Sequence, residues 1–265
     1  MTPTEADQIL SRLDVEHLRT LAHRVPSPVF ATISGAHLYG FESPDSDIDL
    51  RGAFVHPVDD VLGLHPSDET VTIMDDPELD LDLVAHDVRK FARMMTQHNG
   101  YVLEQLYSPL VVVTSDAHET LRALGEGCIT RPTVGHYRGF ARGRRERLRQ
   151  PDPTVKHALY AYRVLLTGIH LMRTGQIESH LPTLNTSFAI PGVGDLIERK
   201  RAGHEKMGLA DTELQHHEAA LASLQDELES AWDRSTLPEE PTTTAALEAF
   251  VIELRLTAHS AEATR

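Results

Sequence analysis

A glycine-bracketed turn between two short apolar runs is the feature that most constrains the fold of this chain. The run VFATI at 29–33 predicts a buried strand, and it leads into GAHLYG at 35–40, where two glycines bracket a turn or a short helix. Residues 47–55 alternate and predict a second strand. Asp47 and Asp49 are two residues apart at its head, so in an extended chain both carboxylates project from one face.

A third strand is predicted at residues 78–84, where strict alternation places the carboxylates on one face. Neighbouring carboxylates repel one another unless a hard cation lies between them, and Mg²⁺ prefers oxygen ligands. A third carboxylate on an adjacent strand would complete a two-metal site for in-line phosphoryl or nucleotidyl transfer. Asp80 and Asp82 both qualify, and we favour Asp82 because the apolar pair at 83–84 follows it directly.

The remaining pattern predicts an α+β fold. An amphipathic helix is expected at 5–24, and another begins after Asp87, which is suited to be its N-cap. From about residue 132 the strand signal fades. We therefore predict an N-terminal α+β domain over 1–120 and a helical C-terminal domain over 121–265. The later helices are predicted at 155–169, 211–232 and 243–259.

Composition excludes several other classes of protein. The single cysteine, Cys128, allows no internal disulfide and no cysteine-based zinc cluster. No stretch reaches the roughly 18 apolar residues of a membrane span, so we expect no membrane partner. The first residues lack the basic start and apolar core of a signal peptide, and we expect a cytoplasmic protein. The sequence does not indicate the oligomeric state.

Charge is distributed unevenly along the chain. The formal net charge is −15, yet residues 42–87 carry 14 acids and one base, whereas residues 131–173 carry ten bases and two acids. An acidic and a basic segment in one fold suggest metal ions bound by the first and phosphates by the second. Solvated surface loops are the alternative interpretation.

The turn and the paired carboxylates together resemble the nucleotidyltransferase signature of the DNA polymerase β superfamily. That signature is Gly-Ser-x-x-x-Gly followed shortly by Asp-x-Asp, and here it corresponds to GAHLYG at 35–40 and SDIDLRG at 46–52. More closely, the chain resembles the RNA-ligase-associated (RlaP-like) predicted nucleotidyltransferases of bacteria and phages, whose stretch tends to end in Arg-Gly. The resemblance continues to about residue 201 through 89–91, 99–109, 156–163 and 196–200.

The resemblance implies that 1–120 is a nucleotidyltransferase catalytic domain with a short mixed sheet and that 121–265 is a helical domain that binds substrate and closes over the nucleotide. It also implies a site and a reaction. Asp47 and Asp49 would bind both Mg²⁺ ions, with Mn²⁺ as a substitute, and Asp82 would bind the catalytic one and help to deprotonate the acceptor hydroxyl. Gly35 and Ala36 would hold the phosphates of a nucleoside triphosphate such as ATP through backbone N–H groups. A nucleoside monophosphate would pass to a hydroxyl, and pyrophosphate would leave.

Two residues depart from the family pattern. Ala36 stands where serine is usual, so one hydroxyl donor to phosphate is lost unless Ser34 replaces it, and His37 stands where arginine is common. We expect weaker triphosphate binding, since backbone donors do not depend on side chains. A catalytically silent nucleotide-binding or partner protein is the alternative that these departures leave open.

The basic segment 131–173 is expected to supply the second half of the site. Lys156, Tyr160 and Arg163 are spaced i, i+4, i+7 and form one helical stripe beside the apolar one. Lysine and arginine there could hold the triphosphate and Tyr160 could stack on a base, whereas a plain surface stripe is the alternative. An arginine cluster that could follow RNA phosphates, or be a solvated loop, comprises Arg142, Arg144, Arg145, Arg147 and Arg149.

The sequence does not identify the molecule that accepts the nucleotidyl group. An RNA end, in RNA repair or modification, is favoured by the arginine-rich stretch and by the association of the resembling branch with RNA ligases. A protein hydroxyl or a small molecule would use the same residues. A metal-dependent phosphohydrolase built on the dipeptide His86-Asp87 is a rival of another class, but capping already explains Asp87.

Overall fold

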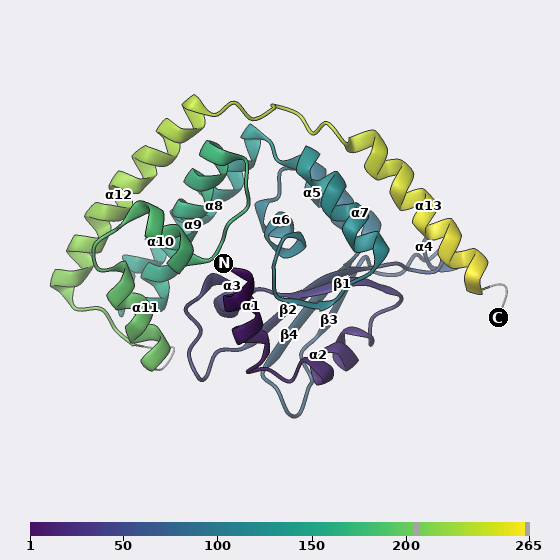
Figure 1. Ribbon diagram of the computed structural model, residues 1–265, viewed down its shortest axis with the longest axis horizontal. Helices are drawn as coiled ribbons and strands as arrows, with labels where there is room; N and C mark the ends of the chain where they lie inside the picture. The colour runs from purple at the N-terminus through teal and green to yellow at the C-terminus, as the bar shows by residue number, and fades with distance from the viewer. Residues whose placement is uncertain (204–206, 263–265) are drawn as a thin grey trace. The chain divides into compact units, whose positions relative to one another are not determined.

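The computed structural model describes residues 1–203 and 207–262 (Figure 1). The chain divides into two compact units that alternate along the sequence. Within the described chain, the sheet unit comprises residues 2–34, 47–128 and 241–262. The helical unit comprises Met1, residues 35–46 and residues 129–240. The predicted division into 1–120 and 121–265 stays a prediction.

Within the described residues, five strands form one mixed sheet in the order β3-β4-β2-β1-β5. β2 and β4 run parallel, and every other pair of neighbours is antiparallel. Phe30, Leu50 and Phe54 are buried in the core of this unit, where the Phe30 ring meets Phe91 edge-on at 5.3 Å. The strands are β1 (Pro28–Ile33), β2 (Ile48–Phe54), β3 (Thr70–Ile73), β4 (Leu81–Asp87) and β5 (Val111–Val113).

Helices complete the sheet unit, and α13, drawn in yellow, lies beside α4, α5 and α7 (Figure 1). They are α1 (Pro3–Leu10), α2 (Val15–Ala22), α4 (Val58–Leu62), α5 (Val88–Thr96), α6 (Gly100–Leu106), α7 (Asp116–Gly125) and α13 (Thr244–Glu262), with a 3₁₀ turn at Glu126–Cys128.

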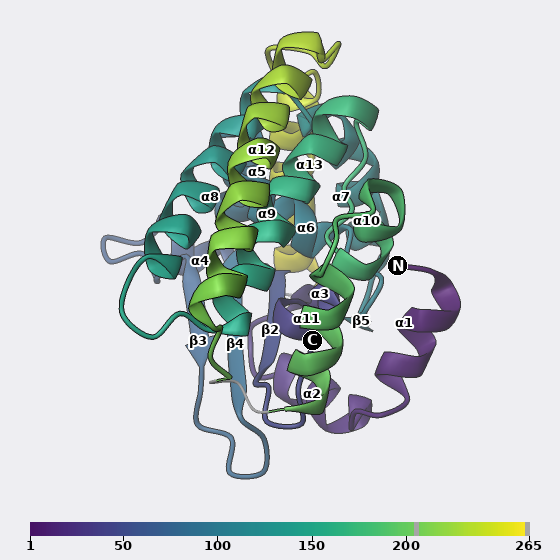
Figure 2. The same ribbon diagram turned by 90° about the vertical axis from the view of Figure 1, so that its left-hand side faces the viewer.

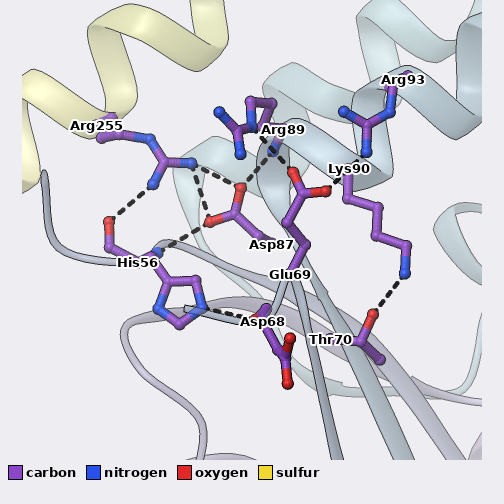
Figure 3. A network of polar contacts seen from close by, with 9 residues as sticks. All are labelled: His56, Asp68, Glu69, Thr70, Asp87, Arg89, Lys90, Arg93 and Arg255. Carbon is purple, nitrogen blue, oxygen red and sulfur yellow. Dashed lines mark hydrogen bonds and ion pairs between the residues drawn. The ribbon is translucent and has the colours of Figure 1, made fainter. Parts of the chain in front are cut away.

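A buried ion pair fixes α13 to the sheet unit (Figure 3). The Asp87 carboxylate is fully buried and accepts hydrogen bonds from Arg255 Nη2 at 2.7 and 2.9 Å. It also accepts from the backbone N–H of His56 at 3.1 Å and of Arg89 at 2.9 Å, the second being the N-cap bond of α5. The Asp87 carboxylate thus links the end of β4, the start of α5 and the C-terminal helix α13.

The helical unit is built around α9, which is buried along most of its length between α8 and α12 (Figure 2). Its Thr154 N-cap accepts from the His157 N–H, and Gly175 ends it in the left-handed conformation. The helices of this unit are α3 (Gly35–Tyr39), α8 (Val134–Leu148), α9 (Val155–Thr174), α10 (Leu181–Phe188), α11 (Val193–Ala202) and α12 (Asp211–Arg234), with a 3₁₀ turn at Arg131–Thr133.

The α+β class predicted from the sequence is confirmed, with the sheet in the N-terminal half and helices after it. The single helix expected at 5–24 is instead two, because Asp14 caps a new helix by accepting from the His17 N–H at 3.0 Å. No described helix combines the length and the apolar character that crossing a membrane requires.

Candidate active site

The parallel pairing of β2 and β4 brings two of the predicted carboxylates together. Asp49 and Asp82 are direct partners in the register of these strands. Their carboxylates meet at the guanidinium of Arg51, whose Nη2 donates to Asp49 Oδ1 at 2.5 Å and to Asp82 Oδ2 at 2.6 Å. The two acids therefore converge on one positive charge.

Arg51 is held in this position from several sides. Its Nε donates to the Tyr101 hydroxyl at 3.0 Å, and its Nη1 donates to the backbone carbonyls of Leu50 and Asp82. Burial opposes the charge on Arg51, but Tyr101 and the two aspartates outweigh it, so the pKa of the guanidinium is raised. The sequence motif includes Arg51 without assigning it a role, although it is the only lysine or arginine between residues 42 and 87.

The remaining acceptor atoms of this cluster fit a hard cation. Asp82 Oδ1 is buried and has no hydrogen-bond partner among the described residues, which is costly for a carboxylate oxygen unless another group binds there. Asp47 lies one residue before β2, and its carboxylate likewise has no partner within the described chain. Among the described residues, no group of three or more His, Cys, Asp or Glu side chains is arranged so that it could hold a metal ion.

Asp80 is placed differently from Asp82. It lies just before β4 and is exposed, and its contribution to the sheet is a backbone carbonyl that accepts from the Ile48 N–H at 2.8 Å. The geometry therefore brings Asp82, and not Asp80, to Asp49.

Ser34 ends the strand that leads into the glycine turn. Its backbone N–H donates to the Asp49 carbonyl at 2.8 Å, which ties the residue to the carboxylate strand. Its hydroxyl is fully buried and finds no hydrogen-bond partner among the described residues. The Ser34 hydroxyl therefore has an unused hydrogen-bonding capacity beside the turn, and its replacement of the serine missing at position 36 stays a prediction.

The glycine turn itself belongs to the helical unit, where α3 carries Gly35 and Ala36. Gly40 ends the turn at φ +77°, and a side chain there would overlap the ring of His180, so both the backbone and the available space require glycine. His37, the other departure from the family pattern, is buried in α3. The turn is thus closely packed.

The predicted stripe on α9 contacts the end of this turn. The Arg163 guanidinium lies 4.0 Å from the Tyr39 ring and is only 5% exposed. The Tyr160 ring meets Tyr39 and Phe41 edge-on at 5.8 and 5.2 Å. Lys156 follows one turn away, with Nζ 5.9 Å from the Tyr160 ring. The structure therefore brings all three residues into one chain of contacts with the turn.

Lys200 is a residue to which the sequence patterns assign no role of its own. It lies on α11, is fully buried, and donates to the Ser43 hydroxyl in the segment between the turn and Asp47. Ser43 in turn contacts the Ser46 hydroxyl at 3.1 Å. Burying a lysine is expensive, so this contact is a strong constraint on the segment. The signal that could have found it was its place in the resembling stretch 196–200.

The five arginines of the predicted cluster have three different surroundings. Arg145 donates to Gln225 and Arg149 forms an ion pair with Glu218 at 3.0 Å, both on α12. Arg142 is exposed, whereas Arg144 and Arg147 line a cavity beside α9. The two arginines that face α12 are explained by packing.

The dipeptide of the phosphohydrolase alternative is accounted for by structural contacts. Asp87 is occupied by Arg255 and by two backbone donors, as described above. His86 Nδ1 lies 3.0 Å from the Thr70 hydroxyl, which also accepts from Lys90 (Figure 3 shows Thr70 and Lys90). Burial and the charges of Lys90 and Arg51 lower the pKa of His86 to about 4.

Comparison with known proteins decides the family. A profile of the RNA repair pathway DNA polymerase beta family (RlaP) matches residues 9–253. The chain belongs to this family. Two curated relatives match the RlaP chain, both described only as uncharacterized proteins. MJ0002 of Methanocaldococcus jannaschii is 28% identical over 57% of this chain, and YcgL of Bacillus subtilis is 28% identical over 67% of it.

These matches cover the relatives to different extents. The aligned part spans 63% of MJ0002, under two thirds of its length, and 71% of YcgL. The RlaP assignment confirms the resemblance recognised in the motifs at 35–40 and 46–52.

Proposed function

We propose that this RlaP chain is a Mg²⁺-dependent nucleotidyltransferase that moves a nucleoside monophosphate from a nucleoside triphosphate to the hydroxyl of an RNA end. The observation that carries the proposal is the convergence of Asp49 and Asp82 on one positive charge, next to an acceptor oxygen of Asp82 that lacks a donor among the described residues. Family membership supports the reaction class.

The proposed reaction forms one bond and breaks one. The acceptor oxygen attacks the α-phosphorus, the bond to the bridging oxygen breaks, and pyrophosphate leaves. Asp47, Asp49 and Asp82 would hold Mg²⁺ or Mn²⁺, which would supply charge neutralisation at the phosphate and activation of the hydroxyl. Asp82 would help to deprotonate the attacking hydroxyl, and the proton would leave to solvent.

The other predicted residues would bind the nucleotide. Backbone N–H groups at Gly35 and Ala36 and the Ser34 hydroxyl would donate to phosphate oxygens. Lys156 would add positive charge, and Tyr160 would present a ring to the base. Arg163, buried against Tyr39, would act by positioning the turn.

Transfer of label from each α-labelled nucleoside triphosphate tests the proposal. The protein is incubated with Mg²⁺ or Mn²⁺ and with total RNA or total protein, and a D47N/D49N double variant runs alongside. We expect label in RNA that disappears in the variant. Label in protein instead of RNA would show that the acceptor is a protein hydroxyl, while the proposed nucleotidyl transfer would still hold. Nucleotide binding with no transfer in either pool would overturn the proposal in favour of a silent binder.

A further inference from the structure

A large cavity lies between α8 and α9 in the helical unit, and these helices run side by side in both views (Figures 1 and 2). Its volume is about 1190 Å³. Cations, aromatic rings and helix glycines line it together, among them Arg144, Arg147, Lys156, Phe140, Tyr160 and Gly139.

The cavity carries an excess of positive charge. Arg144, Arg147 and Lys156 line it, whereas Asp152 is the one carboxylate in its lining among the described residues. Neither arginine forms an ion pair with a carboxylate in the part of the chain that the structure describes. Burial and the three cations lower the pKa of His157, another lining residue. The lining is therefore complementary to a polyanion.

Aromatic rings lie beside these cations. Phe140 is 45% exposed, and its neighbour His136 lies 4.6 Å away between ring centres. On the facing helix, α9, the Tyr160 ring lies 4.8 Å from the Arg144 guanidinium. Rings interleaved with cations are the arrangement that binds successive bases and phosphates of a single strand.

The glycines of α8 keep the cavity open. Gly135, Gly139 and Gly143 recur every four residues, and a Cβ at any of them would meet nothing within 4 Å. Glycine is unfavourable inside a helix, and no packing contact in the described structure requires it at these three positions. Its effect is to leave the helix backbone bare toward the cavity, where a flat group can approach closely.

We propose that the cavity between α8 and α9 binds a single-stranded stretch of the RNA acceptor, with bases against Phe140 and phosphates on Arg144 and Arg147. Its volume exceeds the roughly 300–1,000 Å³ of pockets for small ligands, which favours several nucleotides over one. A duplex would hide its bases from the rings. The assignment of this strand as acceptor rests on the proposed function, but its binding does not.

Fluorescence anisotropy of a labelled oligouridylate of about 12 nucleotides tests this directly, without nucleotide or metal. We expect Phe140→Ala and Arg147→Glu each to weaken binding about tenfold or more. Arg142→Glu is the matched control, because it makes the same charge change on the same helix at an exposed residue outside the cavity, and we expect an effect of less than about threefold.

Gly139→Leu separates binding from folding. It fills the cavity without altering charge and replaces a residue that is unfavourable in a helix, so we expect weaker RNA binding together with an unchanged or higher melting temperature. Equal losses in R142E and R147E, or equal affinity for a duplex of the same length, would overturn the proposal. A protein that binds the oligomer through these residues but transfers no label would overturn the proposed function alone.

Discussion

At the scale of single residues, the central feature is Arg51, which joins Asp49 and Asp82. The period-2 pattern placed both Asp80 and Asp82 on one face, and only the apolar pair at 83–84 favoured Asp82. The register of β2 and β4, which pairs Asp82 with Asp49, was not predicted. The same pattern places Arg51 on the face of Asp49, but its contact with Tyr101 was not predictable because Tyr101 comes from a separate helix. Such contacts depend on tertiary packing.

Asp82 and Asp80 form a matched pair for testing the carboxylate assignment. We expect Asp82→Asn to reduce the rate of pyrophosphate release by about 10³-fold or more, because charge stabilisation at the transition state usually supplies the largest share of the rate enhancement. Asp80→Asn, at an exposed residue two positions away, should retain nearly all of the rate. A larger loss at Asp80 would reverse the assignment.

His86 and His136 are expected to make stability depend on pH. The pKa of each is lowered to about 4, mainly by burial, against an ordinary value near 6.5. Between these pH values the unfolded chain binds more protons than the folded one, so the free energy of unfolding falls as pH drops from 6.5 to 4. In urea titrations across this range, His86→Gln should reduce the fall by about 1 kcal/mol, because solvent screens part of the effect. An unaltered pH profile would show that the fold leaves the pKa of His86 at its ordinary value.

At the scale of elements, the long periodic helices and the strands of six or seven residues were predicted, whereas the two shortest strands were not. The helices at 155–169 and 211–232 correspond to α9 and α12, because each keeps an apolar stripe over several turns. Strands β3 and β5 are four and three residues long, too short to establish a period, and were missed.

The glycines of α8 allow a prediction about this helix alone. Gly139→Ala should raise the free energy of unfolding by about 1 kcal/mol, since alanine is the better helix former and the added methyl meets no neighbour. Gly40→Ala is the opposite control, because residue 40 has a positive φ and no space for a Cβ. Chemical unfolding of both variants measures the difference.

The ion pair between Arg255 and Asp87, which fixes α13 to the sheet unit, predicts a larger effect on the free energy of unfolding than the helix glycines do. Arg255→Met leaves the fully buried Asp87 carboxylate with two backbone donors and no counter-charge, so we expect a loss of about 3 kcal/mol in unfolding free energy. Arg234→Met removes an arginine that is 67% exposed from its pair with Glu227 and should cost less than about 1 kcal/mol. Similar costs for both variants would contradict the anchoring role.

At the scale of the whole molecule, the unequal distribution of charge limits how RNA can bind. The net charge of −15 opposes a polyanion at long range, so attraction must come from the few cations around the cavity. With Arg144 and Arg147 as the phosphate contacts, log affinity for single-stranded RNA should fall with log salt at a slope of about −1.4. A slope several times steeper would indicate a much broader basic surface.

The way in which the chain groups into two units could not be predicted from the sequence either. Composition changes near residue 130, which suggests two consecutive domains. It contains no sign that residues 35–46 pack with the later helices. That grouping depends on Tyr39 and Phe41 meeting Tyr160, and on Ser43 meeting Lys200, partners more than 100 positions away.

Because the two units alternate along the chain, a single cut in the gene cannot separate them. A gene fragment that ends at residue 128 would encode the glycine turn without the helices that pack on it and would lack α13. A fragment that begins at 129 would encode those helices with the place of residues 35–46 left empty. Neither half is a transferable module, so recombination that keeps function must exchange both units at once.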